Sequence, residues 1–140
     1  MPGHDVSTPG IGIWTPYTPT WASTGTAPAL GNGTLIGTYV IIGKTLIFNI
    51  VQIMGSTTTY GTGDYSWTIP SGYTAAAHQT FPAWAVDQGT AFRIGMGDIA
   101  SGGTAMFVTP GGAGTKWGAS VPHVWANTDE LVLNGTFAIN

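Results

Sequence analysis

The stretch Thr34–Met54, TLIGTYVIIGKTLIFNIVQIM, carries the pattern that decides the fold. Its first part, Thr34–Ile42, is rich in β-branched residues and follows Gly31-Asn32-Gly33, a turn signal in which Asn-Gly accepts positive φ. Gly43 then reverses the chain, and Lys44–Met54 returns as a second strand. Glycine, threonine and isoleucine crowd both segments and lower their helix propensity. The stretch therefore predicts a β-hairpin.

The second strand of this hairpin is apolar on both of its faces. One face carries Leu46, Phe48, Ile50 and Met54, and the other carries Ile47, Val51 and Ile53. A strand that is exposed on one side would alternate apolar and polar residues. We therefore expect a central strand that is covered on both sides, by a second sheet on one side and by a neighbouring subunit or the N-terminal segment on the other.

Further segments show strand patterns and are separated by turn residues. They are Tyr65–Ile69, Phe81–Asp87, Thr90–Ile99, Thr104–Thr109, Val121–Ala126 and Glu130–Ile139. The glycines are expected to be turn residues, and no segment has a helical pattern. About eight or nine strands at this spacing predict an all-β fold, an antiparallel β-sandwich of jelly-roll type.

The N-terminal residues 1–20 differ from the rest because they hold four prolines, which fix φ and cannot donate to a ladder. They predict an extended arm rich in proline and glycine, followed by a single β-sandwich domain over residues 21–140. Trp14, Tyr17 and Trp21 lie in or just beyond the arm, and aromatic side chains in such a place serve to dock it. The docking surface is either the chain's own body or a neighbouring subunit.

Charged residues make up only 6% of the chain, against roughly 25% in an ordinary soluble domain. Three lysines and arginines cannot neutralise a row of phosphates, so we expect no nucleic-acid partner. The lack of cysteine excludes disulfides and cysteine metal sites. No apolar run reaches the ~20 residues of a membrane helix, and the N-terminus lacks the features of a secretory signal. We expect no membrane insertion and no signal peptide.

The ionisable residues show no catalytic or metal-binding spacing. The acidic candidates are Asp64, Asp87, Asp98, Asp129 and Glu130. They give no paired-carboxylate signal of a glycoside hydrolase, and most occupy positions typical of turn caps. The histidines, at positions 4, 78 and 123, lack zinc-site spacing, although the axis of a trimer would bring three copies of one histidine together. We predict a protein that is not an enzyme and has no catalytic residue, metal or cofactor.

Aromatic residues suggest another kind of site, because aromatic rings beside amide and carboxylate groups stack on sugar rings in water. The aromatic residues in or beside the predicted strands are Trp67, Tyr73, Trp84, Trp117 and Trp125. Tryptophan in a strand belongs to a core more often than to a ligand platform. The glycan-binding candidates are Trp117, Trp84 and Tyr73, and Trp117, in a glycine-rich loop, is the one most expected to be exposed.

Two segments resemble a known family. WASTGTAPALGNGTLIGTY at Trp21–Tyr39, continued by IGKTL at Ile42–Leu46, is similar to the opening of a β-sandwich domain in minor tail and tail-fibre proteins of phages that infect actinobacteria. The similarity covers Pro19–Met54, and the final LVLNGTFAI fits the end of that domain. The resemblance implies a trimeric module displayed on a virion, often after a long shaft. No shaft is present here, so attachment through the arm, as in decoration proteins and head fibres, is also expected.

These observations leave three classes of function open. The first is a structural phage virion protein of minor tail or tail-fibre type, a surface-displayed homotrimer that contacts other virion proteins and contributes to host attachment. A capsid decoration or head-fibre protein, anchored by the N-terminal arm, is the alternative placement. The second class is a carbohydrate-binding module for host-envelope glycans. The third is a glycan-degrading depolymerase, which requires a carboxylate pair.

Overall fold

The computed structural model describes residues 12–111 and 114–140, which form nine β-strands and no helix. The strands are β1 (Thr15–Tyr17), β2 (Trp21–Ser23), β3 (Thr34–Ile42), β4 (Thr45–Ile53), β5 (Tyr65–Thr68), β6 (Gln79–Asp87), β7 (Ala91–Ile99), β8 (Ala105–Thr109) and β9 (Glu130–Ala138). The predicted all-β class and strand number are confirmed. No helix able to cross a membrane occurs in these two ranges.

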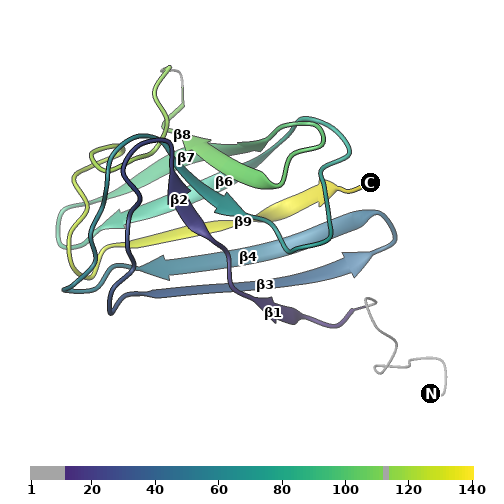
Figure 1. Ribbon diagram of the computed structural model, residues 1–140, viewed down its shortest axis with the longest axis horizontal. Coiled ribbons are helices and arrows are strands. Elements are labelled where there is room, and N and C mark those ends of the chain that lie inside the picture. Colours follow the sequence, from purple (N-terminus) through teal and green to yellow (C-terminus); the bar gives the residue numbers. More distant parts are fainter. Residues whose placement is uncertain (1–11, 112–113) are drawn as a thin grey trace.

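All nine strands belong to one continuous antiparallel sheet, in the order β1-β3-β4-β9-β6-β7-β8-β5-β2. The sheet curls round (Figure 1). Its two edge strands, β1 and β2, follow one another in the chain. Long twisted strands coil a sheet in this way. Strand pairing runs from one edge to the other without a break, so the division into the two sheets of a sandwich is not confirmed.

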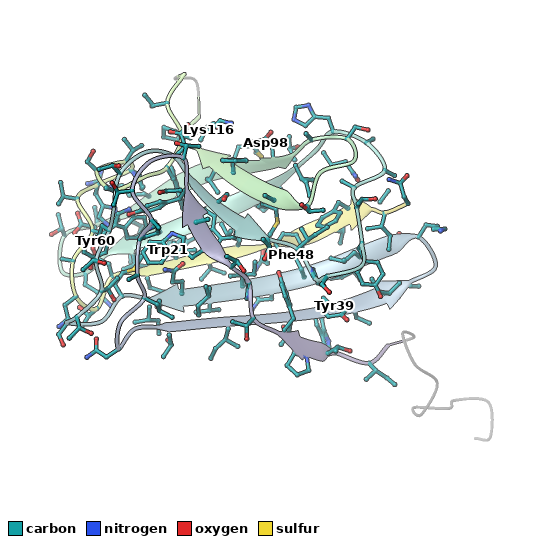
Figure 2. All side chains as sticks on the ribbon, in the orientation of Figure 1. Trp21, Tyr39, Phe48, Tyr60, Asp98 and Lys116 are labelled. Atoms are coloured by element: carbon teal, nitrogen blue, oxygen red, sulfur yellow. The ribbon has the colours of Figure 1, made fainter. Side chains whose placement is uncertain are left out.

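The inner face of the curled sheet encloses the hydrophobic core. Every second residue along β4 and β9 points inward, and the following side chains are at most 1% exposed: Leu46, Phe48, Ile50, Leu131 and Leu133. The Phe48 ring meets Phe81 and Phe137, with ring centroids 5.1 and 5.6 Å away. Figure 2 shows Phe48 and Trp21 within the space that the sheet encloses. Burial of apolar surface on this face stabilises the fold by roughly 25 cal/mol per Å².

Glycines inside β7 leave room for aromatic rings on the inner face. A Cβ atom at Gly97 would overlap the Phe81 ring, and one at Gly95 would lie 2.7 Å from Cζ2 of Trp117. Glycine in a strand often marks such a close approach. The expectation that the glycines are turn residues is therefore wrong at these two positions.

One polar side chain, Gln52 of β4, is fully buried on the inner face. Its carbonyl oxygen accepts a hydrogen bond from Nε1 of the equally buried Trp67 at 2.8 Å. Its amide nitrogen donates to the Met54 sulfur at 3.7 Å. The glutamine thus provides a partner for the buried indole N–H group. Without a partner, that group would destabilise the fold by about 1–3 kcal/mol.

Val121–Ala126 forms a loop, so the predicted strand at this position is wrong. Pro122 has no backbone N–H group to donate to a ladder. His123 and Trp125 are buried, which gives the segment its strand-like alternation, but they contact other loops. The indole of Trp125, for example, donates to the Gly118 carbonyl at 2.9 Å.

Candidate functional site

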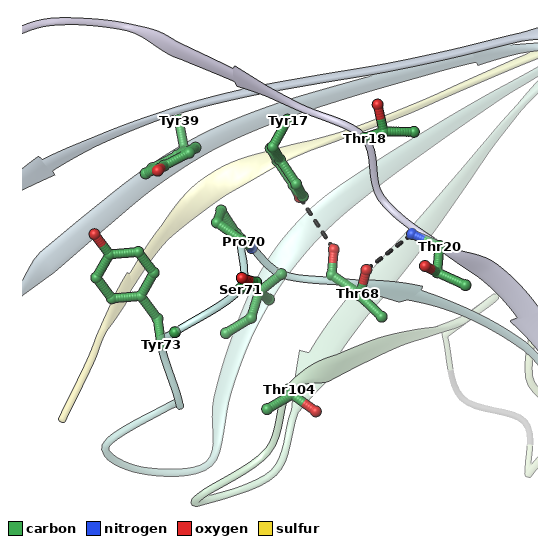
Figure 3. Close-up of a pocket in the computed structure, with 11 residues that line it drawn as sticks. Tyr17, Thr18, Thr20, Tyr39, Thr68, Pro70, Ser71, Tyr73 and Thr104 are labelled. Atoms are coloured by element: carbon green, nitrogen blue, oxygen red, sulfur yellow. Dashed lines mark hydrogen bonds between the residues drawn. The ribbon is translucent and has the colours of Figure 1, made fainter.

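The two edges of the curled sheet meet at a seam, which Thr18–Thr20 bridges between β1 and β2. Thr68, at the end of β5, is hydrogen-bonded to Thr20 in this segment and to Tyr17 just before it. Its N–H group donates to the Thr20 carbonyl at 3.2 Å, and its hydroxyl accepts from the Thr20 N–H group at 2.8 Å. The Tyr17 hydroxyl donates to the Thr68 carbonyl at 3.1 Å (Figure 3). The seam is therefore fixed by contacts between the two ends of the sheet.

A pocket of about 640 Å³ lies at this seam, and we call it the seam pocket. Its volume falls within the roughly 300–1,000 Å³ of small-molecule sites. Much of its lining consists of side chains with hydroxyl groups, which besides tyrosines are Thr18, Thr20, Thr68, Ser71 and Thr104. None of the residues that line it is charged.

Three tyrosines from separate segments wall the seam pocket. The ring centroids of Tyr17 and Tyr39 lie 5.7 Å apart with planes at 83°, and those of Tyr39 and Tyr73 lie 6.0 Å apart at 66°. Edge-to-face contacts of this kind are favourable for aromatic rings. Burial raises the pKa of the Tyr17 phenol, and burial together with the nearby Tyr73 phenol raises the pKa of Tyr39. The Tyr17 and Tyr39 hydroxyls therefore stay protonated at neutral pH.

Sequence reasoning selects Tyr17 and Tyr73 for different roles and does not select Tyr39. The pairing of β1 with β3 places Thr15 opposite Tyr39 and Tyr17 opposite Gly37, so both tyrosines face the same side. A short strand with two prolines close to it carries no sequence signal for this pairing. The convergence of the three rings is a result of tertiary structure alone.

The outer face of the sheet carries an apolar row across five strands. In register, Ile36 of β3 lies beside Val51 of β4, followed by Val132 of β9, Trp84 of β6 and Ile94 of β7. Residues directly opposite one another in antiparallel strands share a face. Ile36 is 61% exposed and Ile94 is 71% exposed. We call these five residues the outer row.

Other exposed apolar side chains widen the outer row. Phe92 of β7 stacks on Trp84, with ring centroids 5.1 Å apart and planes 26° apart. Met96 of β7 and Ile53 of β4 are also exposed. Contiguous exposed apolar patches mark interaction surfaces. The prediction that β4 is apolar on both faces is confirmed, and what covers its outer face stays a prediction.

The three predicted glycan-binding residues do not lie in one site. Trp117 is fully buried, so the expectation that it is exposed is wrong. Its ring lies against Gly95 and meets Trp125 edge to face at 6.2 Å. Trp84 belongs to the outer row, whereas Tyr73 lines the seam pocket. The sequence around Trp117 does not show this burial, because Gly95 of β7, against which the ring packs, is distant in the sequence.

The three aromatic residues predicted to dock the N-terminal arm have different surroundings. Trp21 is buried in the core and meets Tyr65 edge to face at 5.0 Å. Tyr17 is half-buried at the seam. Trp14 is 53% exposed and lies near Ile47 on the outer face. Tyr17 and Trp21 thus pack on the chain's own body, and residues 1–11 of the predicted arm lie outside the described residues.

Asp87, His123 and Asp129 form a group whose possible metal-ligand atoms lie within 4.8 Å of one another. His123 Nε2 is 3.1 Å from Asp129 Oδ2. The Asp129 carboxylate also accepts hydrogen bonds from the N–H groups of Gln88 and Ala126, both at 2.9 Å. Asp129 therefore ties the β6–β7 turn to the loop before β9. Asp129 itself is only 2% exposed.

Comparisons with protein-family models, with curated proteins and with solved structures found no match. Two surfaces of the chain, the outer row and the seam pocket, have the features of binding sites, and they lie on different parts of the sheet.

Proposed function

We propose that this chain is a non-enzymatic structural protein of a phage particle, which assembles as a homotrimer through the outer face of its sheet. The outer row is the observation that carries the proposal, because it extends an uncharged apolar surface over five strands. Burial of that surface against a partner would contribute roughly 25 cal/mol per Å² before the costs of association.

Further copies of the chain are the partners that suit this surface best. The five residues of the row are uncharged in every copy, so the rows can converge on a three-fold axis, while Glu130 borders the row on the same face, opposite Ile53 of β4 and Val86 of β6. The formal net charge of −3 produces only weak repulsion between copies. Most soluble oligomers are assemblies of identical chains with closed symmetry. The number three comes from the resemblance of Pro19–Met54 to trimeric phage tail modules.

The same resemblance supports a place on the phage tail, where the module contributes to attachment to the host surface. Low charge is tolerable in a protein that is held in an assembly, because repulsion between free molecules matters less there. A place on the capsid, as a decoration or head-fibre protein, uses the same assembly surface.

Gold-labelled antibodies against this chain, applied to intact particles and imaged by electron microscopy, test the proposal. Label on the particle is the expected result, and label at the tail tip supports the attachment role. Label over the head assigns the chain to the capsid instead. Particles that carry no label, while the denatured chain on a blot is recognised, would reject a role in the virion.

A further inference from the structure

The seam pocket combines three aromatic rings with a rim of hydroxyl groups and no charged side chain. We infer that it binds one neutral pyranose ring of a saccharide. A pyranose has an apolar C–H face that packs on an aromatic ring and hydroxyl groups that exchange hydrogen bonds with a hydroxyl rim. This inference goes beyond the proposed function, because the seam pocket is separate from the outer row and binds its ligand whatever the assembly.

The chemistry of the lining excludes other ligand classes. A phosphate or carboxylate ligand requires a cationic partner when it is taken out of water, and a cation requires an anionic one. The seam pocket offers neither. A purely apolar ligand would cover the hydroxyls of Thr18, Ser71 and Thr104 without giving them hydrogen-bond partners, at about 1–3 kcal/mol for each group. A neutral molecule with both an apolar face and several hydroxyls satisfies the lining.

The residues of the seam pocket divide into a framework and a contact surface. The framework is Tyr17, Thr20 and Thr68, whose hydrogen bonds join the two ends of the sheet. Figure 3 shows Tyr73 at a distance from these bonds, on the segment that follows β5. Tyr73 is half-buried, and Ser71 beside it is exposed. Tyr73 therefore provides the ring for stacking, with Ser71 at the rim.

The framework also makes the pocket pre-formed. Its hydrogen bonds, at 2.8 to 3.2 Å, hold β1 and the end of β5 in place without a ligand. The Tyr39 ring, edge to face with both Tyr17 and Tyr73, supports the wall from β3. A site that is already ordered loses little conformational entropy when it binds. Binding of a small ligand such as a single sugar depends on this saving.

A proline-rich peptide is the competing occupant, because extended proline helices dock into aromatic-lined grooves. Residues 1–16 of this chain, which precede the lining residues in the sequence and hold three prolines, are such a sequence. The hydroxyls of Thr18, Ser71 and Thr104 favour the sugar, whose own hydroxyls can both donate to them and accept from them, whereas a proline residue offers only a carbonyl acceptor. The peptide is accordingly included in the test.

The test is saturation-transfer NMR on the full chain with the methyl glycosides of glucose, galactose, mannose, rhamnose and arabinose at millimolar concentration. We expect transfer to the ring protons of at least one glycoside. Tyr73→Ala should weaken that binding at least tenfold, and Tyr73→Phe, which keeps the ring, by threefold or less. Trp84→Ala is the matched control, because it removes an exposed aromatic ring from the outer row and should leave binding unchanged.

A second variant keeps the test valid if Tyr73→Ala does not fold. Ser71→Arg places a long cation at the exposed rim without removing a buried group, and it should also abolish transfer. The absence of transfer from the wild-type chain to any of the five glycosides would overturn the inference. So would binding that survives Ser71→Arg but is lost in Trp84→Ala, or transfer to a synthetic peptide of residues 1–16 when no glycoside binds.

Discussion

The inner and outer faces of β4 carry similar side chains but have different surroundings. On the inner face, Leu46, Phe48 and Ile50 are at most 1% exposed. On the outer face of the same strand, Ile53 is 40% exposed, and Ile94, at the end of the outer row on β7, is 71% exposed. Both faces are apolar, so hydrophobicity alone does not decide which face is enclosed.

The direction of the curl decides it. The sheet curls toward the face on which Phe48 meets Phe81 and Phe137, and Gly97 of β7 lets the Phe81 ring approach the backbone. A side chain on this face is therefore tied to the stability of a single chain. A side chain on the outer face has little to do with that stability and is free to serve contacts between chains.

The largest expected effect is on the inner face. Phe48→Ala should destabilise the chain by about 3–5 kcal/mol, because it removes a fully buried ring and leaves a cavity between Phe81 and Phe137. Ile94→Ala on the outer face should change the free energy of unfolding by no more than about 0.5 kcal/mol. Urea unfolding, at a concentration where light scattering gives a monomer, measures both. Equal losses in the two variants would contradict the difference between the faces.

A smaller effect is expected from the buried polar group of the inner face. Gln52→Leu replaces the amide with an apolar group of similar size and leaves the Trp67 N–H group unpaired, so it should cost about 1–3 kcal/mol. Trp67→Phe removes the donor, and in that background Gln52→Leu should cost clearly less. A double-mutant cycle from unfolding curves measures this coupling. Additive effects would show that the hydrogen bond does not stabilise the core.

The smallest effect on stability, and the one that concerns assembly, is expected on the outer face. Ile94→Glu places a charge in the outer row and should lower the mass of the assembly to that of a monomer while the chain stays folded. Val124→Glu is the matched control, since Val124 is 75% exposed in the loop before β9 and is not a residue of the row. Light scattering coupled to size exclusion measures the mass. A wild-type monomer, or equal loss of mass in both variants, would contradict the role of the outer row.

Much of the fold can be predicted from local sequence patterns. The hairpin of β3 and β4 and the final strand β9 have bounds within about one residue of those expected, because long runs of β-branched and alternating residues identify strands well. The wrong strand prediction at Val121–Ala126 arises because buried residues of a loop can alternate with exposed ones as in a strand. His123 and Trp125 are buried from a loop, and their alternation is the same as that of a strand residue pair.

The candidate site can be predicted from the sequence only in small part. Tyr73 is selected from the sequence as a ring beside polar residues, and it does line the seam pocket. Its neighbours Tyr17 and Tyr39 are brought to it by strand pairing across the closure of the sheet, which has no local pattern. Trp117 shows the reverse error, since a glycine-rich loop suggests exposure whereas the ring is packed against Gly95 of β7.

The sequence by itself determined the all-β class, the hairpin, the two apolar faces of β4 and the scarcity of charge. These properties depend on residue type and on a period of two, which are local. Tertiary structure alone decided which apolar face is enclosed, that one curled sheet forms, and that three tyrosines meet at its seam. Those outcomes depend on contacts between residues far apart in the chain, such as Tyr17 with Thr68, and no short-range pattern encodes them.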